Sequence, residues 1–96
     1  FNRILKQTGL GANFDNLFEP TEMVKEIQKL GNVAEAEAYK TWNMGNGMML
    51  VVDADDAEAV LENLTVEAKI VGKIIPENKI VIDTKGCDPQ RLSFDI

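Results

Sequence analysis

The sequence predicts an α+β domain in which helices pack on a mainly antiparallel sheet. Two stretches, residues 21–30 and 57–64, place apolar side chains at helical spacing. Two others, residues 68–75 and 79–84, are rich in β-branched residues and are separated by a turn signal. The unbroken apolar run 48–52 predicts a further, fully buried strand.

The first third of the chain predicts a helix end, a short strand and a helix. Residues 1–6 are apolar and basic, and we interpret them as the end of a helix broken at Gly9 and Gly11. Residues 12–17 alternate between apolar and polar side chains, which is typical of a short strand. The helix over 21–30 carries an apolar face formed by Met23, Val24, Ile27 and Leu30.

The middle of the chain predicts a second helix close behind the first. Gly31 is well placed to end the first helix. Asn32 and Glu35 then have the three-residue spacing of a capping box, which predicts a helix running to about Trp42. A glycine-containing loop over residues 43–47 leads into the predicted buried strand.

The second half of the chain predicts a helix, a hairpin and an edge strand. Asp55 and Glu58 form another capping-box pair, and the helix they open ends near Leu64. Residues 76–78 form a turn signal between the two β-branched stretches, which predicts a hairpin. Residues 91–96 predict a last edge strand. This strand, helix and hairpin order gives the fold a partly ferredoxin-like character.

Composition limits the class of protein. The 96 residues suit a single domain, residues 1–96, with one modest core. The net charge of -6 argues against nucleic acid or an anionic membrane surface as the partner. No apolar run approaches the length of a membrane helix. The single cysteine, Cys87, and the absence of a signal peptide fit a reducing, cytoplasmic compartment. Because the chain opens on Phe1, we expect it to be part of something longer.

The most informative stretch for function is the loop over residues 43–47. Gly45 and Gly47 lack a Cβ, so a ligand or another backbone can approach closely. The side chains of Asn43 and Asn46 and the exposed backbone N–H groups suit a phosphate or a polar substrate. The alternative is a tight helix-to-strand turn that needs glycine for geometry alone, since a Gly-x-Gly pattern is a weak signal.

The residues around this loop resemble a known family. Gly-Asn-Val at 31–33, a short acidic helix, and then Tyr-Lys-Thr-Trp-Asn-Met-Gly-Asn-Gly-Met at 39–48 resemble a signature of the aminoimidazole ribonucleotide synthetase C-terminal domain. Residues 15–20 and 69–74 resemble the family's flanking segments. The resemblance covers residues 1–84 and points to this purine enzyme family rather than to sister ATP-dependent families of the same fold.

The chain departs from the family pattern in three places. Trp42 stands where the family usually has Phe, which keeps a large aromatic anchor. Asn46 stands where a small or branched apolar residue is more typical, so we expect a change in the loop. The tail beyond Lys85 has no evident family counterpart, and the family's ATP-binding N-terminal domain lies outside the sequence.

The resemblance implies a role within a cyclo-ligase. In such an enzyme ATP phosphorylates the formamide oxygen of formylglycinamidine ribonucleotide, and the amidine nitrogen then closes the imidazole ring and expels phosphate. ATP and Mg²⁺ are implied for the whole enzyme, and none of the catalytic or metal residues is assigned to this chain. We expect Asn43, Gly45 and Gly47 to form one wall of the substrate cleft, with an ATP-binding domain and a small-molecule substrate as partners.

Other features have competing interpretations. Asp53, Asp55 and Asp56 suit a Mg²⁺ or Ca²⁺ site, but at a helix start they also suit capping of free N–H groups. Cys87 lacks a histidine to activate it, because the chain has none, and is interpreted as a spectator thiol. A set of large side chains suits either base stacking or, as we favour, core packing: Tyr39, Trp42, Met44, Met48 and Met49.

Two classes of function therefore stay open. The chain is either part of an enzyme and inactive alone, or a separate binding or assembly module of the same fold. Within the enzyme class, a domain of a sister ATP-dependent family is a further alternative. In either case we expect it to expose apolar surface when isolated, and to self-associate as a homo-oligomer.

Overall fold

The computed structural model describes residues 2–96, which form four α-helices, one short 3₁₀ helix and four strands. The first half contains α1 (Asn2–Thr8), β1 (Gly11–Phe14), α2 (Glu22–Leu30) and α3 (Glu35–Thr41). The second half contains η1 (Ala54–Asp56), α4 (Ala57–Asn63), β2 (Gly72–Ile75), β3 (Lys79–Asp83) and β4 (Arg91–Asp95). The predicted α+β class is confirmed, and so is the last edge strand. Phe1, the first residue of the predicted helix end, lies outside the described residues.

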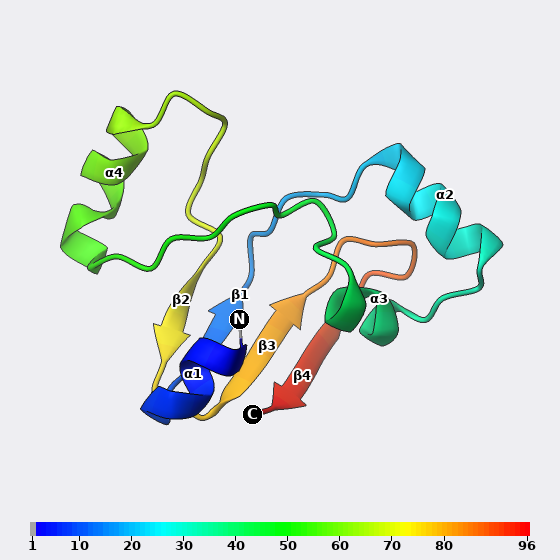
Figure 1. Ribbon diagram of the computed structural model, residues 1–96, viewed down its shortest axis with the longest axis horizontal. Coiled ribbons are helices and arrows are strands. Elements are labelled where there is room, and N and C mark those ends of the chain that lie inside the picture. The colour runs from blue at the N-terminus through cyan, green and yellow to red at the C-terminus, as the bar shows by residue number, and fades with distance from the viewer. Residues whose placement is uncertain (1) are drawn as a thin grey trace.

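The four strands form one sheet in the order β2-β1-β3-β4. The pairings of β1 with β2 and of β3 with β4 are antiparallel, and β1 runs parallel to β3. The predicted hairpin is wrong, because β1 lies between β2 and β3 and separates them (Figure 1). The turn over residues 76–78 reverses the chain as predicted, but the strands that it connects, β2 and β3, lie on either side of β1 and do not pair with each other.

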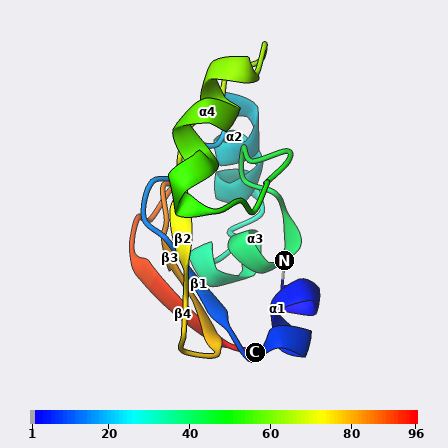
Figure 2. The ribbon, with the colours of Figure 1, turned by 90° about the vertical axis from the view of Figure 1, so that its left-hand side faces the viewer.

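Helices α1 and α3 lie against one face of the sheet, whereas α2 and α4 lie beyond the carboxyl ends of β1 and β3 (Figures 1 and 2). On that face Ala12 and Phe14 of β1 and Ile80 and Ile82 of β3 are buried, because alternate residues of a strand point to the same side. Leu5 of α1 packs into the same cluster. The core is completed by Leu17 and by partly buried side chains, namely Tyr39, Met49, Val71, Phe94 and Ile96.

The predicted buried strand over residues 48–52 is wrong. These residues contain no strand, and four of them are largely exposed, with Met48 at 85% and Leu50 and Val51 at 60%. An unbroken apolar run is typical of a strand covered on both faces, but among residues 2–96 no strand pairs with it. Without it, the predicted ferredoxin-like unit lacks its first strand.

Helix α2 presents its two faces to unexpected surroundings. The predicted apolar face is open, with Met23 71% exposed, Ile27 50% and Leu30 80%. The buried residue of this helix is instead Gln28, which is 3% exposed. The hydrophobic pattern is that of a helix with a covered apolar side, yet residues 2–96 cover the opposite side.

The N-termini of α3 and α4 differ from the two capping boxes predicted for them, whereas α2 has a side-chain cap. Thr21 caps α2, with its side chain accepting a hydrogen bond from the Val24 N–H at 3.4 Å. The capping box predicted from Asn32 and Glu35 does not form: Ala34 precedes α3 without a side-chain cap bond. The Asp55–Glu58 box does not form either, because Asp55 lies inside η1 and no side chain caps α4.

The four helices are short. The longest of those in residues 2–96 has nine residues, and none has the length and hydrophobicity needed to cross a bilayer.

Candidate functional site

Several chain segments meet at one edge of the sheet, where the parallel strands β1 and β3 have their carboxyl ends. Residues 15–18 follow β1, and residues 84–86 follow β3. Because β2 is antiparallel to β1, the residues just before it, 69–71, reach the same edge. In open sheets ligands often bind beyond the carboxyl ends of parallel strands. The 43–47 loop also joins this edge, through a hydrogen bond from the Phe18 N–H to Asn46.

Asn46 holds the loop in place. Its Oδ1 accepts the Phe18 N–H at 3.1 Å, and its Nδ2 donates to the carbonyls of Asn43 at 3.4 Å and Met44 at 3.2 Å. Within the loop, Asn43 Oδ1 accepts the Gly45 N–H at 3.1 Å. The residue that departs from the family pattern thus ties this loop to the segment after β1, which an apolar side chain would not do.

The two loop glycines differ in their reason for being glycine. Gly45 has φ +92, and a Cβ there would lie 2.6 Å from the carbonyl oxygen of Glu19. Its lack of a side chain is therefore explained by backbone geometry. Gly47 has no positive φ, and a Cβ there would meet no atom of residues 2–96 within 4 Å. Gly47 therefore has free space beside it, which a ligand or another chain segment would need.

The large side chains flanking the loop divide into buried and open ones. Met44 is 1% exposed, and the half-buried Tyr39 and Met49 pack against the core, as predicted. Trp42 is also half-buried, but it lines a groove beside α2. Met48, at 85% exposure, is not in the core. Tyr39 also links α3 to the site edge, because its hydroxyl accepts the Lys85 N–H at 2.8 Å. Partial burial raises the pKa of that hydroxyl above its ordinary value.

Two lysines that sequence reasoning did not single out meet at this edge. Lys69 Nζ donates to the carbonyl oxygen of Leu17 at 3.1 Å, and Lys85 Nζ donates to the same oxygen at 2.5 Å. The Lys69 ammonium also lies 4.7 Å from the centre of the Phe18 ring. Sixteen positions separate these lysines in the sequence, and only the sheet order brings them together, so no local pattern signals the pair.

The C-terminal tail is held by a buried carboxylate. Glu35 is 3% exposed and accepts hydrogen bonds from the Gly86 N–H at 3.0 Å and from Gln28 Nε2 at 2.8 Å. The Cys87 N–H donates to Gln28 Oε1 at 3.4 Å. We call Gln28, Glu35 and Gly86 the polar clamp. It joins α2 and α3 to the segment between β3 and β4, and Cys87 itself stays exposed and free.

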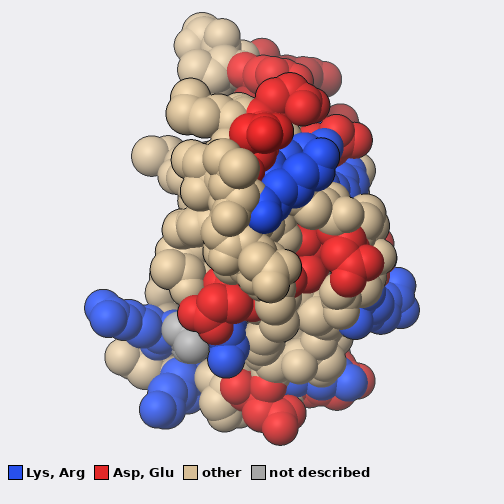
Figure 3. All heavy atoms as spheres, turned by 90° about the vertical axis from the view of Figure 1, so that its right-hand side faces the viewer, with Lys and Arg blue, Asp and Glu red and all other residues tan. Residues whose placement is uncertain are grey.

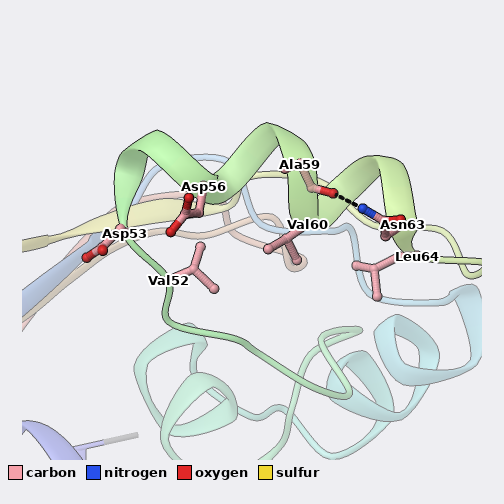
Figure 4. Close-up of a pocket in the computed structure, with 7 residues that line it drawn as sticks. All are labelled: Val52, Asp53, Asp56, Ala59, Val60, Asn63 and Leu64. Atoms are coloured by element: carbon pink, nitrogen blue, oxygen red, sulfur yellow. Dashed lines mark hydrogen bonds between the residues drawn. The ribbon is translucent and has the colours of Figure 1, made fainter.

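The aspartates before α4 line an open groove of about 620 Å³ (Figure 4). Asp53 and Asp56 lie at one end, with Val52, Val60 and Leu64 along its length. Neither Asp53 nor Asp56 makes a side-chain cap bond, so the predicted capping role is wrong. Among residues 2–96 no three cysteine or carboxylate side chains gather closely enough to hold a metal ion.

Comparison with known proteins identifies the family. Residues 1–85 match the family model "AIR synthase related protein, C-terminal domain". The chain therefore belongs to this family, and the resemblance predicted from the 39–48 signature is confirmed.

The curated relatives named here are phosphoribosylformylglycinamidine cyclo-ligases of archaea. The Methanocaldococcus jannaschii protein is 40% identical over 75 residues, which cover 70% of this chain and 21% of the relative. The Methanopyrus kandleri protein is 42% identical over 74 residues, covering 75% and 21%. That of Methanococcoides burtonii is 40% identical over 73 residues, covering 76% and 21%. The chain thus spans about a fifth of the length of these relatives. No solved structure matches it.

Proposed function

We propose that this chain is the C-terminal part of a phosphoribosylformylglycinamidine cyclo-ligase and forms one wall of its substrate cleft. The observation that carries the proposal is the match of 40% identity or more to such enzymes, over a segment that includes the signature loop. The loop is bonded to the segment after β1, at the carboxyl ends of β1 and β3. Ligands often bind at this place in open sheets, which supports the proposal. Gly47 and the exposed Asn43 are the loop residues proposed to face the substrate, and Gly45 shapes the loop.

ATP and Mg²⁺ belong, in this proposal, to the rest of the enzyme. Phosphoryl transfer requires a metal and a cradle of N–H donors or cations around the nucleotide. The described residues offer no gathered set of metal ligands. In this proposal the rest of the enzyme carries out the nucleotide chemistry, and this chain positions the substrate.

The exposed apolar segments support a covering partner. We define them as the α2 face (Met23, Ile27, Leu30) and residues 48–52. Figure 3 shows an uncharged area beside interspersed acidic and basic side chains, on the side of the molecule that carries α2. A further apolar groove of about 270 Å³ is lined by Val24, Ile27 and Trp42. The partner we propose for this surface is the ATP-binding part of the same cyclo-ligase, because the relatives are about five times longer than the matched segment.

A chimera tests the proposal. The corresponding segment of the M. jannaschii cyclo-ligase would be replaced by residues 1–85 of this chain, and aminoimidazole ribonucleotide formation would be assayed with ATP and formylglycinamidine ribonucleotide. We expect activity within about tenfold of the parent enzyme, and none from the parent truncated before the segment. A folded chimera of parental size that lacks ring closure would reject the cyclo-ligase assignment and favour a separate binding or assembly module.

A further inference from the structure

The lysine pair at the site edge has an unusual electrostatic environment. Lys69 and Lys85 donate to one carbonyl oxygen, so their ammonium nitrogens are no farther apart than the two hydrogen bonds together. Both side chains are half-buried. Two like charges this close repel each other, more strongly where water is partly excluded. The chain nevertheless holds the two lysines together, and they form a local positive cluster in a chain whose net charge is -6.

No carboxylate neutralises the pair at close range. Within residues 2–96, Lys25 pairs with Glu19 at 3.5 Å and Arg91 with Asp83 at 2.7 Å, but neither Lys69 nor Lys85 forms an ion pair. The pKa of Lys69 lies below its ordinary value, first because partial burial disfavours the charged form and then because Lys85 repels it. Glu67 and Glu19 shift the pKa in the opposite direction, and theirs are the smallest of the contributions. Within residues 2–96 the pair therefore has no carboxylate in direct contact, and Glu67 and Glu19 compensate its charge only in part.

The surroundings orient Lys69. Asn16 Oδ1 lies 3.4 Å from Lys69 Nζ, and Asn16 Nδ2 donates to the Ile70 carbonyl at 2.9 Å, which fixes the amide. The Phe18 ring lies against the ammonium on another side. The Phe18 N–H donates to Asn46 of the 43–47 loop, and the neighbouring Leu17 carbonyl accepts from both lysines. The segment after β1 therefore contacts both the lysines and the loop. An anion held by the lysines would therefore lie beside that loop.

We propose that Lys69 and Lys85 bind a phosphate-type anion at this edge of the sheet. Two adjacent ammonium groups match the double negative charge of a phosphate or phosphate monoester, and lysine binds phosphate as a compact point charge. Binding would relieve the repulsion within the pair. Two sources supply such an anion: a phosphate-ester substrate or free inorganic phosphate. The choice between them rests on the proposed function, whereas binding itself does not.

Titration of the 96-residue chain tests the pair. Inorganic phosphate and ribose 5-phosphate would be added separately near neutral pH, and the backbone amide signals of Phe18, Lys69 and Lys85 followed by NMR. Sodium chloride of equal ionic strength is the reference. We expect saturable shifts with at least one phosphate. Tighter binding of ribose 5-phosphate assigns the site to an ester, and tighter binding of inorganic phosphate assigns it to free phosphate. Shifts that do not saturate, or that chloride reproduces, would overturn the proposal.

Variants separate the pair from general charge. Lys69→Met should weaken phosphate binding about tenfold, because one charge-assisted bond is lost, and Lys69→Arg should retain it. The matched control is Lys29→Met, which removes an equal charge from an exposed position that forms no ion pair with Glu19 or Glu67, and should leave binding unchanged. Equal weakening by both methionine variants would reject a specific site. If the NMR spectrum shows that Lys69→Met is unfolded, phosphate binding by Lys69→Arg becomes the test. Loss of phosphate binding in a folded Lys69→Arg variant would also reject the site.

The outcome is independent of the ring-closure assay. Phosphate binding together with an inactive chimera would reject the cyclo-ligase proposal and keep the anion site. An active chimera, together with an isolated 96-residue chain that binds no phosphate, would keep the cyclo-ligase proposal and reject the anion site.

Discussion

The polar clamp and the exposed apolar segments form opposite environments within one small domain. In the clamp, Gln28 and Glu35 are both 3% exposed and fully engaged in hydrogen bonds. Leu30, which lies two residues after Gln28 in helix α2, is in contrast 80% exposed. A polar interior and an apolar exterior are the reverse of the usual arrangement. The clamp thus joins elements within the described residues, whereas the apolar segments are the surface for which we propose a covering partner.

Removal of the clamp carboxylate is the strongest way to break this contrast. Glu35→Ala leaves the buried Gly86 N–H without its acceptor. It also removes one of the two acceptors of Gln28 Nε2, which keeps its hydrogen bond to the Val33 carbonyl. We expect the free energy of unfolding to fall by about 3 kcal/mol, measured by urea denaturation. Glu37→Ala is the control on the same helix, because Glu37 is exposed, and should change stability by no more than about 0.5 kcal/mol. Equal losses in the two variants would contradict a role for the clamp.

The loop glycines give the next largest effect. Gly45→Ala places a Cβ against the Glu19 carbonyl at a φ of +92, so we expect a loss of about 2 kcal/mol in unfolding free energy. Gly47→Ala meets open space and should leave the free energy of unfolding unchanged, with both variants measured by urea denaturation. In the active chimera, however, Gly47→Ala should reduce ring closure if a substrate occupies that space. Full activity of folded Gly47→Ala would remove Gly47 from the proposed cleft wall.

Charged substitutions on the exposed apolar segments should have little effect on folding. Ile27→Lys and Leu50→Lys lie on open surface, so the stability of the isolated chain should change by no more than about 0.5 kcal/mol. Self-association of the unmodified chain, followed by light scattering at rising concentration, should decrease in both variants. In the chimera the same changes should destabilise the enzyme. A monomeric unmodified chain at high concentration would argue against the predicted self-association.

The smallest effect concerns the exposed ion pair at the sheet edge. Arg91 lowers the pKa of Asp83 below its ordinary 3.8 through hydrogen bonds at 2.7 and 3.1 Å. A depressed folded-state pKa stabilises the fold above the unfolded value, and this contribution is lost as pH falls through the lower folded value. Stability of the unmodified chain should therefore decrease slightly more than that of Arg91→Ala across this acidic window. Parallel stability curves would show that solvent screens the pair completely.

Local patterns predicted most helices and strands but not their neighbours. The spacing of apolar residues found α2 and α4, and the β-branched stretches found β2 and β3. Pairing across the sheet was missed, because a turn over residues 76–78 looks the same whether the strands it connects are adjacent or separated by β1. The lysine pair was missed for a related reason: its members meet through strand order rather than through spacing.

By itself, the sequence determined the fold class, the family and the loop of residues 43–47, because these depend on periodicity and on a contiguous signature. Only the tertiary structure decided which faces are covered. The run 48–52 and the α2 stripe have the hydrophobicity of buried segments, and hydrophobic burial has no direction, so the pattern does not say which surface covers them. Likewise, Glu35 has the spacing of a capping residue, but buried N–H groups from a distant tail compete for its carboxylate and hold it.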